Sequence, residues 1–136
     1  MILPDSVLWI DFMRKKTPQN IRLAIAPYLA SRKTMLCEPI RLEVMRGERK
    51  PDRQKAEGLL TTVPMLRTPV LMWQNAERYG QICLDSGLIV PPVDLLIASV
   101  AVTYSAEVIT FDGHFEAMAK IIPKLKARVL LRPQPV

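Results

Sequence analysis

The sequence has few of the residues that mark a zinc site, a disulfide scaffold or a membrane span. Its 136 residues include two cysteines, Cys37 and Cys83, and one histidine, His114. The cysteines lie far apart without metal-ligand spacing, so we expect buried free thiols in a reducing cytoplasm. No apolar run approaches the roughly 20 residues that span a bilayer, so we expect no membrane partner. The N-terminus is also unlike a signal peptide, because acids interrupt its apolar part.

Basic side chains outnumber acidic ones, 19 to 13, which gives a formal net charge of +6. Such an excess favours a polyanionic partner through long-range electrostatic steering, although many small basic proteins bind no nucleic acid. The basic residues cluster at 46–55 and 120–132. Each cluster could equally be the solvated face of a helix, so charge alone does not identify the partner.

Short apolar runs and helical patterns alternate along the chain. The runs predict strands at 1–4, 33–37, 64–66, 106–111 and 127–132. Helical spacing and start or stop residues predict helices at 7–13, 18–30, 39–47, 51–61, 69–87, 91–104 and 114–122. This alternation predicts a three-layer α/β/α fold with a mainly parallel central sheet. The length and the absence of repeats or long linkers predict a single domain over 1–136.

Four acidic residues occupy places where such a fold builds ligand sites. Asp5 directly follows the first predicted strand, and Asp112 follows the penultimate one. Glu43 lies in the helix after the second strand, and Asp94 lies in the first turn of the most apolar helix. Ligands bind beyond the carboxyl ends of the strands in open parallel sheets. We therefore expect these four carboxylates to converge.

Each acid also has a purely structural interpretation. Asp5 before Ser6 could be a helix cap, and Asp94 could stabilise the N-terminus of its helix. Asp112 comes directly before a glycine and could belong to a turn. Glu43 could be an ordinary surface residue. The prediction of a site depends on the four acids occurring together in a suitable order.

The order of four short motifs resembles a known family. The matching pieces are "ILPDSVLWIDF", "LEVMRG", "PPVDLLIASVA" and "VITFDGHF". They resemble the PIN-domain ribonucleases, and most closely the VapC-like toxins of toxin–antitoxin pairs. The resemblance implies a metal-binding catalytic site at Asp5, Glu43, Asp94 and Asp112. Thr110 matches a supporting hydroxyl of the family, and Ser6 is a second candidate for support.

The sequence departs from the family pattern at two positions. Relatives often have a hydroxyl or amide where this chain has Val7, and some have an acid where it has His114. The four acids are nevertheless complete. For His114 a packing or capping role beside Phe115 and a catalytic or RNA-contacting role both stay open.

The chemistry of clustered carboxylates explains why such a site needs a cation. Two carboxylates ~4 Å apart repel by roughly 4 kcal/mol at an effective dielectric constant near 20. Hard oxygen ligands suit Mg²⁺ or Mn²⁺, and the lack of a His/Cys cluster argues against zinc. The predicted activity is a metal-dependent endoribonuclease that hydrolyses RNA phosphodiester bonds, with 5′-phosphate and 3′-hydroxyl ends implied by the resemblance. Glu43 either completes the metal ligands or positions the water, and one ion or two are possible.

Basic and apolar residues suggest partners. Arg46, Arg49 and Lys50 follow Glu43 and are candidates to line the RNA path. The resemblance implies a homodimer and a cognate antitoxin protein. Six apolar residues are candidates for an interface, with core packing as the alternative for each: Leu8, Trp9, Phe12, Met13, Met72 and Trp73.

Other functions fit parts of the pattern. A receiver domain is disfavoured because Asp5-Ser6 does not provide the paired acids that it needs after its first strand. A catalytically silent PIN-like scaffold that binds nucleic acid or protein stays open. So do a DNA-directed nuclease and an RNA-processing PIN nuclease outside a toxin–antitoxin pair.

Overall fold

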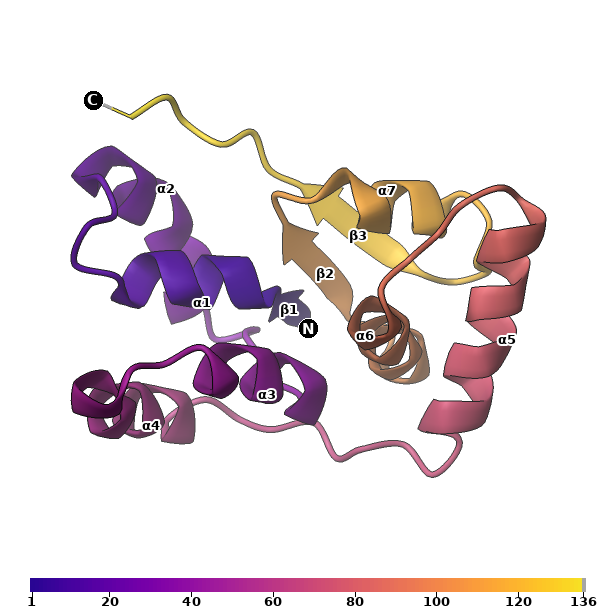
Figure 1. Ribbon diagram of the computed structural model, residues 1–136, viewed down its shortest axis with the longest axis horizontal. Coiled ribbons are helices and arrows are strands. Elements are labelled where there is room, and N and C mark those ends of the chain that lie inside the picture. Colours follow the sequence, from indigo (N-terminus) through magenta and orange to yellow (C-terminus); the bar gives the residue numbers. More distant parts are fainter. Residues whose placement is uncertain (136) are drawn as a thin grey trace.

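A computed structural model describes residues 1–135 of the chain (Figure 1). Its strands are β1 (Ile2–Pro4), β2 (Glu107–Thr110) and β3 (Lys126–Val129). Its helices are α1 (Ser6–Met13), α2 (Gln19–Ala30), α3 (Glu38–Arg46), α4 (Arg53–Thr61), α5 (Met72–Asp85), α6 (Pro92–Tyr104) and α7 (Gly113–Ala119), with a 3₁₀ turn, η1 (Lys50–Asp52), before α4. Within these residues, none of the helices is long and apolar enough to cross a membrane.

The central sheet is parallel, as predicted, with the order β1-β2-β3. The strands predicted at 33–37 and 64–66 are each reduced to isolated parallel bridges, between Ile2 and Thr34 and between Leu36 and Met65. Pro64 has no N–H to extend the pairing, although its carbonyl accepts the Leu36 N–H at 2.8 Å. These segments therefore widen the sheet beside β1 without forming regular strands.

Apolar side chains cover both faces of the sheet. Val108 of β2 lies in the large core cluster, which also holds residues of α3, α5, α6 and α7. The next residue, Ile109, points to the opposite face, because successive side chains of a strand alternate. There it packs with Leu8 of α1 and Ile25 of α2. The sheet is therefore a middle layer between helices, with α1 and α2 on one side and α5 and α6 on the other (Figure 1).

Helix α6 brings an acidic residue to the edge of this core. Pro91 and Pro92 stand at its start, where a missing N–H costs no helical hydrogen bond. The helix is then apolar and largely buried, and it ends at Ser105 in the left-handed conformation, with φ 54°. Its burial fixes the position of Asp94 in the first turn.

The C-terminal segment crosses back to the first two helices (Figure 1). The Arg132 guanidinium lies 2.5 Å from Asp11 Oδ2 and also stacks over the Phe111 ring. The Asn20 amide donates a hydrogen bond to the Gln134 carbonyl at 2.5 Å. These contacts connect the end of the sheet to α1 and α2.

Candidate metal centre

Asp5 joins the carboxyl ends of two neighbouring strands. It follows β1 and caps α1, where its Oδ1 accepts the Ser6 N–H at 2.7 Å. Its Oδ2 accepts the Thr110 hydroxyl at 3.1 Å, and Thr110 is the last residue of β2. Both residues are buried, with 4% and 0% of their surface exposed. Burial raises the pKa of the Asp5 carboxyl, the hydrogen bonds from Ser6 and Thr110 oppose this rise, and the neighbouring Glu43 and Asp112 add to it.

Ser6 connects Asp5 to the second acidic helix. Its hydroxyl donates to Glu43 Oε1 at 3.0 Å, and Glu43 lies in the middle of α3. A residue in the first turn of α1 thus holds the carboxylate of a different helix. Ser6 and Thr110 therefore each donate a hydrogen bond to an acidic side chain of the cluster.

Asp94 is a buried carboxylate without a hydrogen-bond partner among residues 1–135. Its side chain lies in the first turn of α6, and the residue is only 9% exposed. Its pKa rises from 3.8 to about 7, first because of burial and then because of the nearby carboxylates of Asp5, Glu43 and Asp112, whereas His114 opposes this rise. A buried carboxylate surrounded by other carboxylates is costly to ionise unless a cation neutralises it.

Asp112 and His114 complete the cluster. Asp112 caps α7, and its Oδ1 accepts the His114 N–H at 2.9 Å. Its Oδ2 lies 3.2 Å from His114 Nδ1, and its own N–H donates to the Thr110 hydroxyl at 2.9 Å. One ligand atom each of Asp94, Asp112 and His114 lie within 4.8 Å of one another. These three side chains could hold a single metal ion.

The neighbouring cysteine adds no soft ligand. Cys37 precedes α3 and is 1% exposed. The pKa of its thiol rises to about 12, chiefly because of burial and also because of the nearby carboxylates of Asp5, Glu43 and Glu38. A thiol that stays protonated is neither a nucleophile nor a thiolate ligand. The donors are therefore carboxylates, hydroxyls and one imidazole, and this set together with the unpaired Asp94 suits a divalent cation.

The structure brings all four predicted acids into mutual electrostatic contact, because each of the other three shifts the pKa of Asp94. The structural alternative for Asp5 is confirmed, because it caps α1. Asp112 caps α7, a role that the sequence analysis, which considered a turn, did not predict. Sequence reasoning left the role of His114 open. The sequence did contain a signal for a role near the site: His114 lies two residues after Asp112, the acid that follows a predicted strand.

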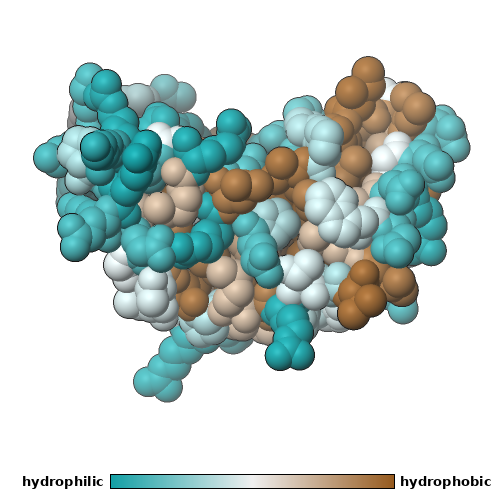
Figure 2. All heavy atoms as spheres, turned by 60° about the horizontal axis from the view of Figure 1, so that its bottom comes forward, coloured by the Kyte–Doolittle hydropathy of each residue, from teal (hydrophilic) through white to brown (hydrophobic). Residues whose placement is uncertain are grey.

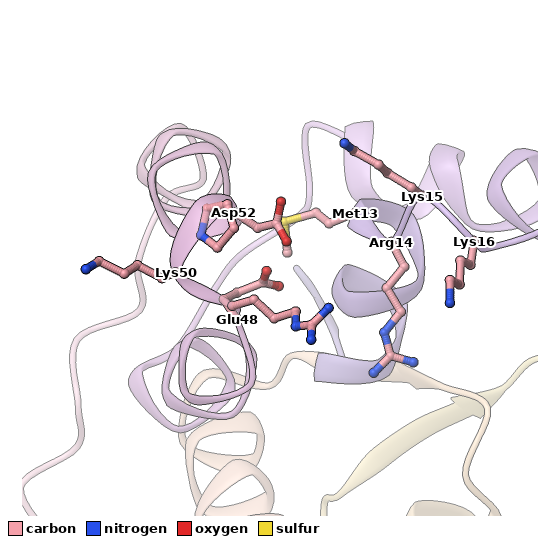
Figure 3. Close-up of a pocket in the computed structure, with 9 residues that line it drawn as sticks. Met13, Arg14, Lys15, Lys16, Glu48, Lys50 and Asp52 are labelled. Atoms are coloured by element: carbon pink, nitrogen blue, oxygen red, sulfur yellow. The ribbon is translucent and has the colours of Figure 1, made fainter.

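The predicted RNA-contacting residues are exposed but are not all in one place. Arg49 and Lys50 line a hollow of about 710 Å³, and Arg46 is not among its lining residues. The opposite wall comes from the end of α1 and the following loop, with Arg14, Lys15 and Lys16 (Figure 3). Sequence reasoning missed this second basic wall, although "RKK" directly follows an apolar helix.

The apolar interface candidates divide into core and surface residues. Leu8, Trp9 and Met72 are buried in the core, so the interface alternative is wrong for them. Trp73 is 65% exposed. Other large apolar residues exposed beside it are Val70 and Leu71, and Figure 2 shows apolar patches on the right-hand part of the molecule, where α5 lies.

Comparison with known families identifies the class of protein. The profile of the PIN domain matches residues 2–121, which is most of the chain. The chain therefore belongs to the PIN domain family, and the resemblance seen in its motifs is confirmed.

Within that family the similar proteins are VapC ribonucleases. The chain is 24% identical to VapC ribonuclease Mb1587 of Mycobacterium bovis over 133 residues, which covers 89% of this chain and 93% of the relative. Ribonuclease VapC11 of Mycobacterium tuberculosis matches with the same identity and coverage. Among solved structures, VapBC2 from Rickettsia felis bound to a DNA fragment from their promoter superposes with a TM-score of 0.71. That match has 17% identity and covers 96% of this chain and 99% of the other, and it supports the α/β fold.

Proposed function

We propose that residues 1–136 form one domain, a divalent-metal-dependent endoribonuclease that acts in the cytoplasm as the toxin of a toxin–antitoxin pair. The observation that supports this most is Asp94, whose buried carboxylate faces three other acids and has no hydrogen-bond partner among residues 1–135. An inert scaffold would gain stability by replacing such a residue, whereas a metal site requires it. The similarity to VapC ribonucleases supports the same activity.

The acidic residues would share the work of holding the cation and the water. Asp94 and Asp112 would bind the cation directly, and Asp5 would bind it from the end of β1. When bound, Mg²⁺ or Mn²⁺ supplies Lewis-acid stabilisation of the phosphoryl oxygens and lowers the pKa of water. Glu43, fixed by Ser6, either completes the ligands or accepts the proton of the attacking water.

Cleavage of RNA by the purified protein tests the proposal. We expect cleavage with Mg²⁺ or Mn²⁺, and its loss with EDTA or in the Asp94→Asn variant. Asp85→Asn is the matched control, because Asp85 is an exposed aspartate at the end of α5. Activity that survives both EDTA and Asp94→Asn would refute the metal-centre proposal. A wild-type protein that binds neither ion would leave the silent scaffold as the better account.

The basic hollow is proposed to hold the RNA beside the acidic cluster. Asp5 stands at one end of α1 and Arg14 at the other. Eight residues at 1.5 Å each make this helix about 12 Å long. Arg49 and Lys50 on one wall and Arg14 on the other would contact phosphates that flank the scissile bond. Unpaired RNA is the expected target, since proteins read unpaired bases most readily.

Salt dependence separates this RNA path from general attraction to a basic protein. Binding of labelled single-stranded RNA is measured in the uncleaving Asp94→Asn background. Each phosphate contact contributes about 0.7 to the slope of log K against log[salt]. We expect the slope to fall by about 2 when Arg14, Arg49 and Lys50, the three residues proposed to contact phosphates, are all replaced by glutamine.

A control with the same change in charge completes the test. Lys120, Lys124 and Lys126 are exposed and lie at the other end of the sequence. Their replacement by glutamine should leave the slope nearly unchanged. Equal effects of the two triple variants would refute a defined path at the hollow.

The exposed apolar residues on α5 are the proposed partner surface. Trp73 lies beside Leu95 and Leu96 of α6 around a small hollow of about 180 Å³. We propose that this surface mediates the homodimer, while a cognate antitoxin covers the acidic cluster. The solved neighbours support an antitoxin partner, because they are toxin–antitoxin complexes. A Trp73→Ser variant that keeps the wild-type mass in light scattering would refute the dimer surface.

A further inference from the structure

The single histidine of the chain lies against the carboxylates of the candidate metal centre. Its Nδ1 is 3.2 Å from Asp112 Oδ2, while Oδ1 of the same carboxylate accepts the His114 N–H at 2.9 Å. The two oxygens of one carboxylate therefore contact the ring and the backbone of His114. Ligand atoms of Asp94, Asp112 and His114 all fall within 4.8 Å of one another, a spacing that one ion can bridge.

We propose that His114 is a nitrogen ligand of the cation held by Asp94 and Asp112, and that it makes the site prefer Mn²⁺ over Mg²⁺. The inference rests on the metal centre of the proposed function. Mg²⁺ demands near-ideal octahedral oxygen coordination, whereas Mn²⁺ and the later first-row ions accept imidazole more readily. Asp94 is an independent indication of a ligand, because the residue is nine-tenths buried, a carboxylate oxygen lies in this cluster, and the side chain has no hydrogen-bond partner among residues 1–135.

The alternative role for His114 is that of a cationic partner of Asp112. Packing does not explain the ring, because 48% of the side chain is exposed, and the cap on α7 uses the backbone N–H and not the imidazole. The two roles predict different effects of removing the ring. A His114 that only pairs with Asp112 competes with the ion for that carboxylate, so its removal would leave metal binding unchanged or strengthen it. If the ring binds the ion, its removal takes away a nitrogen ligand and weakens the binding of Mn²⁺.

Metal titration of the full chain distinguishes these outcomes. Calorimetry at about pH 8, where an ordinary imidazole is neutral, measures the affinities for Mn²⁺ and Mg²⁺. We expect His114→Asn to weaken Mn²⁺ binding by about tenfold or more and to leave Mg²⁺ binding within about twofold. His114→Asp restores an oxygen ligand, so it should recover binding but lower the ratio of Mn²⁺ to Mg²⁺ affinity. Lys120→Gln, which removes a positive charge at the other end of α7, should leave that ratio unchanged.

A spectroscopic readout reports the metal–nitrogen bond directly. Because the chain has one histidine, ¹⁵N-histidine labelling marks His114 alone once any affinity tag is removed. Electron spin echo modulation of the Mn²⁺-loaded protein should change from a ¹⁴N to a ¹⁵N pattern on labelling. Absence of this change, or unchanged or tighter Mn²⁺ binding in His114→Asn, overturns the inference while the metal centre stands. A wild-type chain that binds neither ion would instead overturn the proposed function.

Discussion

The stability of the metal-free protein should fall as the pH rises, and Asp94 should be the main reason. Its pKa rises from 3.8 to about 7 in the folded protein, first because of burial and then because of the nearby acids. Between these pH values the folded chain keeps a proton on Asp94 that the unfolded chain has lost. When the folded state binds more protons, the free energy of unfolding decreases with increasing pH.

The size of this effect follows from the shift in the pKa of Asp94. A tenfold change in proton affinity is worth about 1.4 kcal/mol, so the rise in the Asp94 pKa corresponds to about 4 kcal/mol. The stabilisation is complete below about pH 4 and is lost above about pH 7. An asparagine at this position is uncharged at every pH. Asp94→Asn should therefore be more stable than the wild type at about pH 8, by up to about 4 kcal/mol.

Urea unfolding in EDTA, followed by circular dichroism between about pH 5 and pH 8, measures the difference. The wild type should lose stability across this range, and Asp94→Asn should lose much less. A smaller decline should persist in the variant because burial also raises the pKa of Asp5. The exposed Asp85→Asn control should follow the wild type. Mn²⁺ at 100 times its Kd should restore about 2.7 kcal/mol to the wild type and to Asp85→Asn, but not to Asp94→Asn.

Two results would refute this reasoning. Equal wild-type stability at both ends of the pH range would show that Asp94 is not held protonated in the folded chain. An Asp94→Asn variant less stable than the wild type at the higher pH would show that the carboxylate is stabilised by a partner without any metal. In either case the free-energy cost of ionising the buried Asp94 would no longer support a bound cation.

Three further predictions follow from individual contacts. Thr110→Val should lower the free energy of unfolding in urea by about 1–3 kcal/mol and weaken metal binding, because the Asp5 carboxylate and the Asp112 N–H both lose their hydroxyl partner. A variant that binds metal normally would show that Thr110 does not support the site. Phe115→Ala should lower the free energy of unfolding by about 3–5 kcal/mol, since the ring is fully buried. Trp73 is exposed, so Trp73→Ala should change the free energy of unfolding by no more than about 0.5 kcal/mol. Similar losses in the two variants would contradict the packing described. Arg132→Gln should lower the free energy of unfolding by about 1–3 kcal/mol, because it leaves the buried Asp11 carboxylate without its partner. An unchanged free energy of unfolding would show that this contact of the C-terminal segment adds no stability.

Sequence patterns predicted the helices better than the strands. The helix expected at 91–104 is found as Pro92–Tyr104, because its prolines and apolar composition are local signals. The strand expected at 33–37 depends on partners elsewhere in the chain. One of those partners is interrupted by Pro64, so only isolated bridges form. Pairing across the sheet is a tertiary property that a short apolar run does not contain.

The candidate site was predictable to the extent that it depends on topology. Asp5 and Asp112 each follow a predicted strand, which placed both at the carboxyl end of a parallel sheet. That their strands lie side by side is known only from the structure. The contact between His114 and Asp112 depends on how the first turn of α7 is capped, and no residue pattern specifies the direction of that ring. The second wall of the basic hollow likewise comes from the packing of α1 against α3, which joins segments far apart in sequence.

The hydrogen bond from Thr110 to Asp5 has a consequence for how the protein is made. It joins residues separated by 105 positions, and β1 finds its regular strand partner only in β2. During translation the N-terminal half leaves the ribosome with Asp5 and Glu43 exposed but without Thr110, Asp94 or Asp112. The acidic cluster therefore cannot assemble until most of the chain has been synthesised. A nascent chain with this connectivity therefore carries no complete candidate metal centre until the protein is almost fully synthesised.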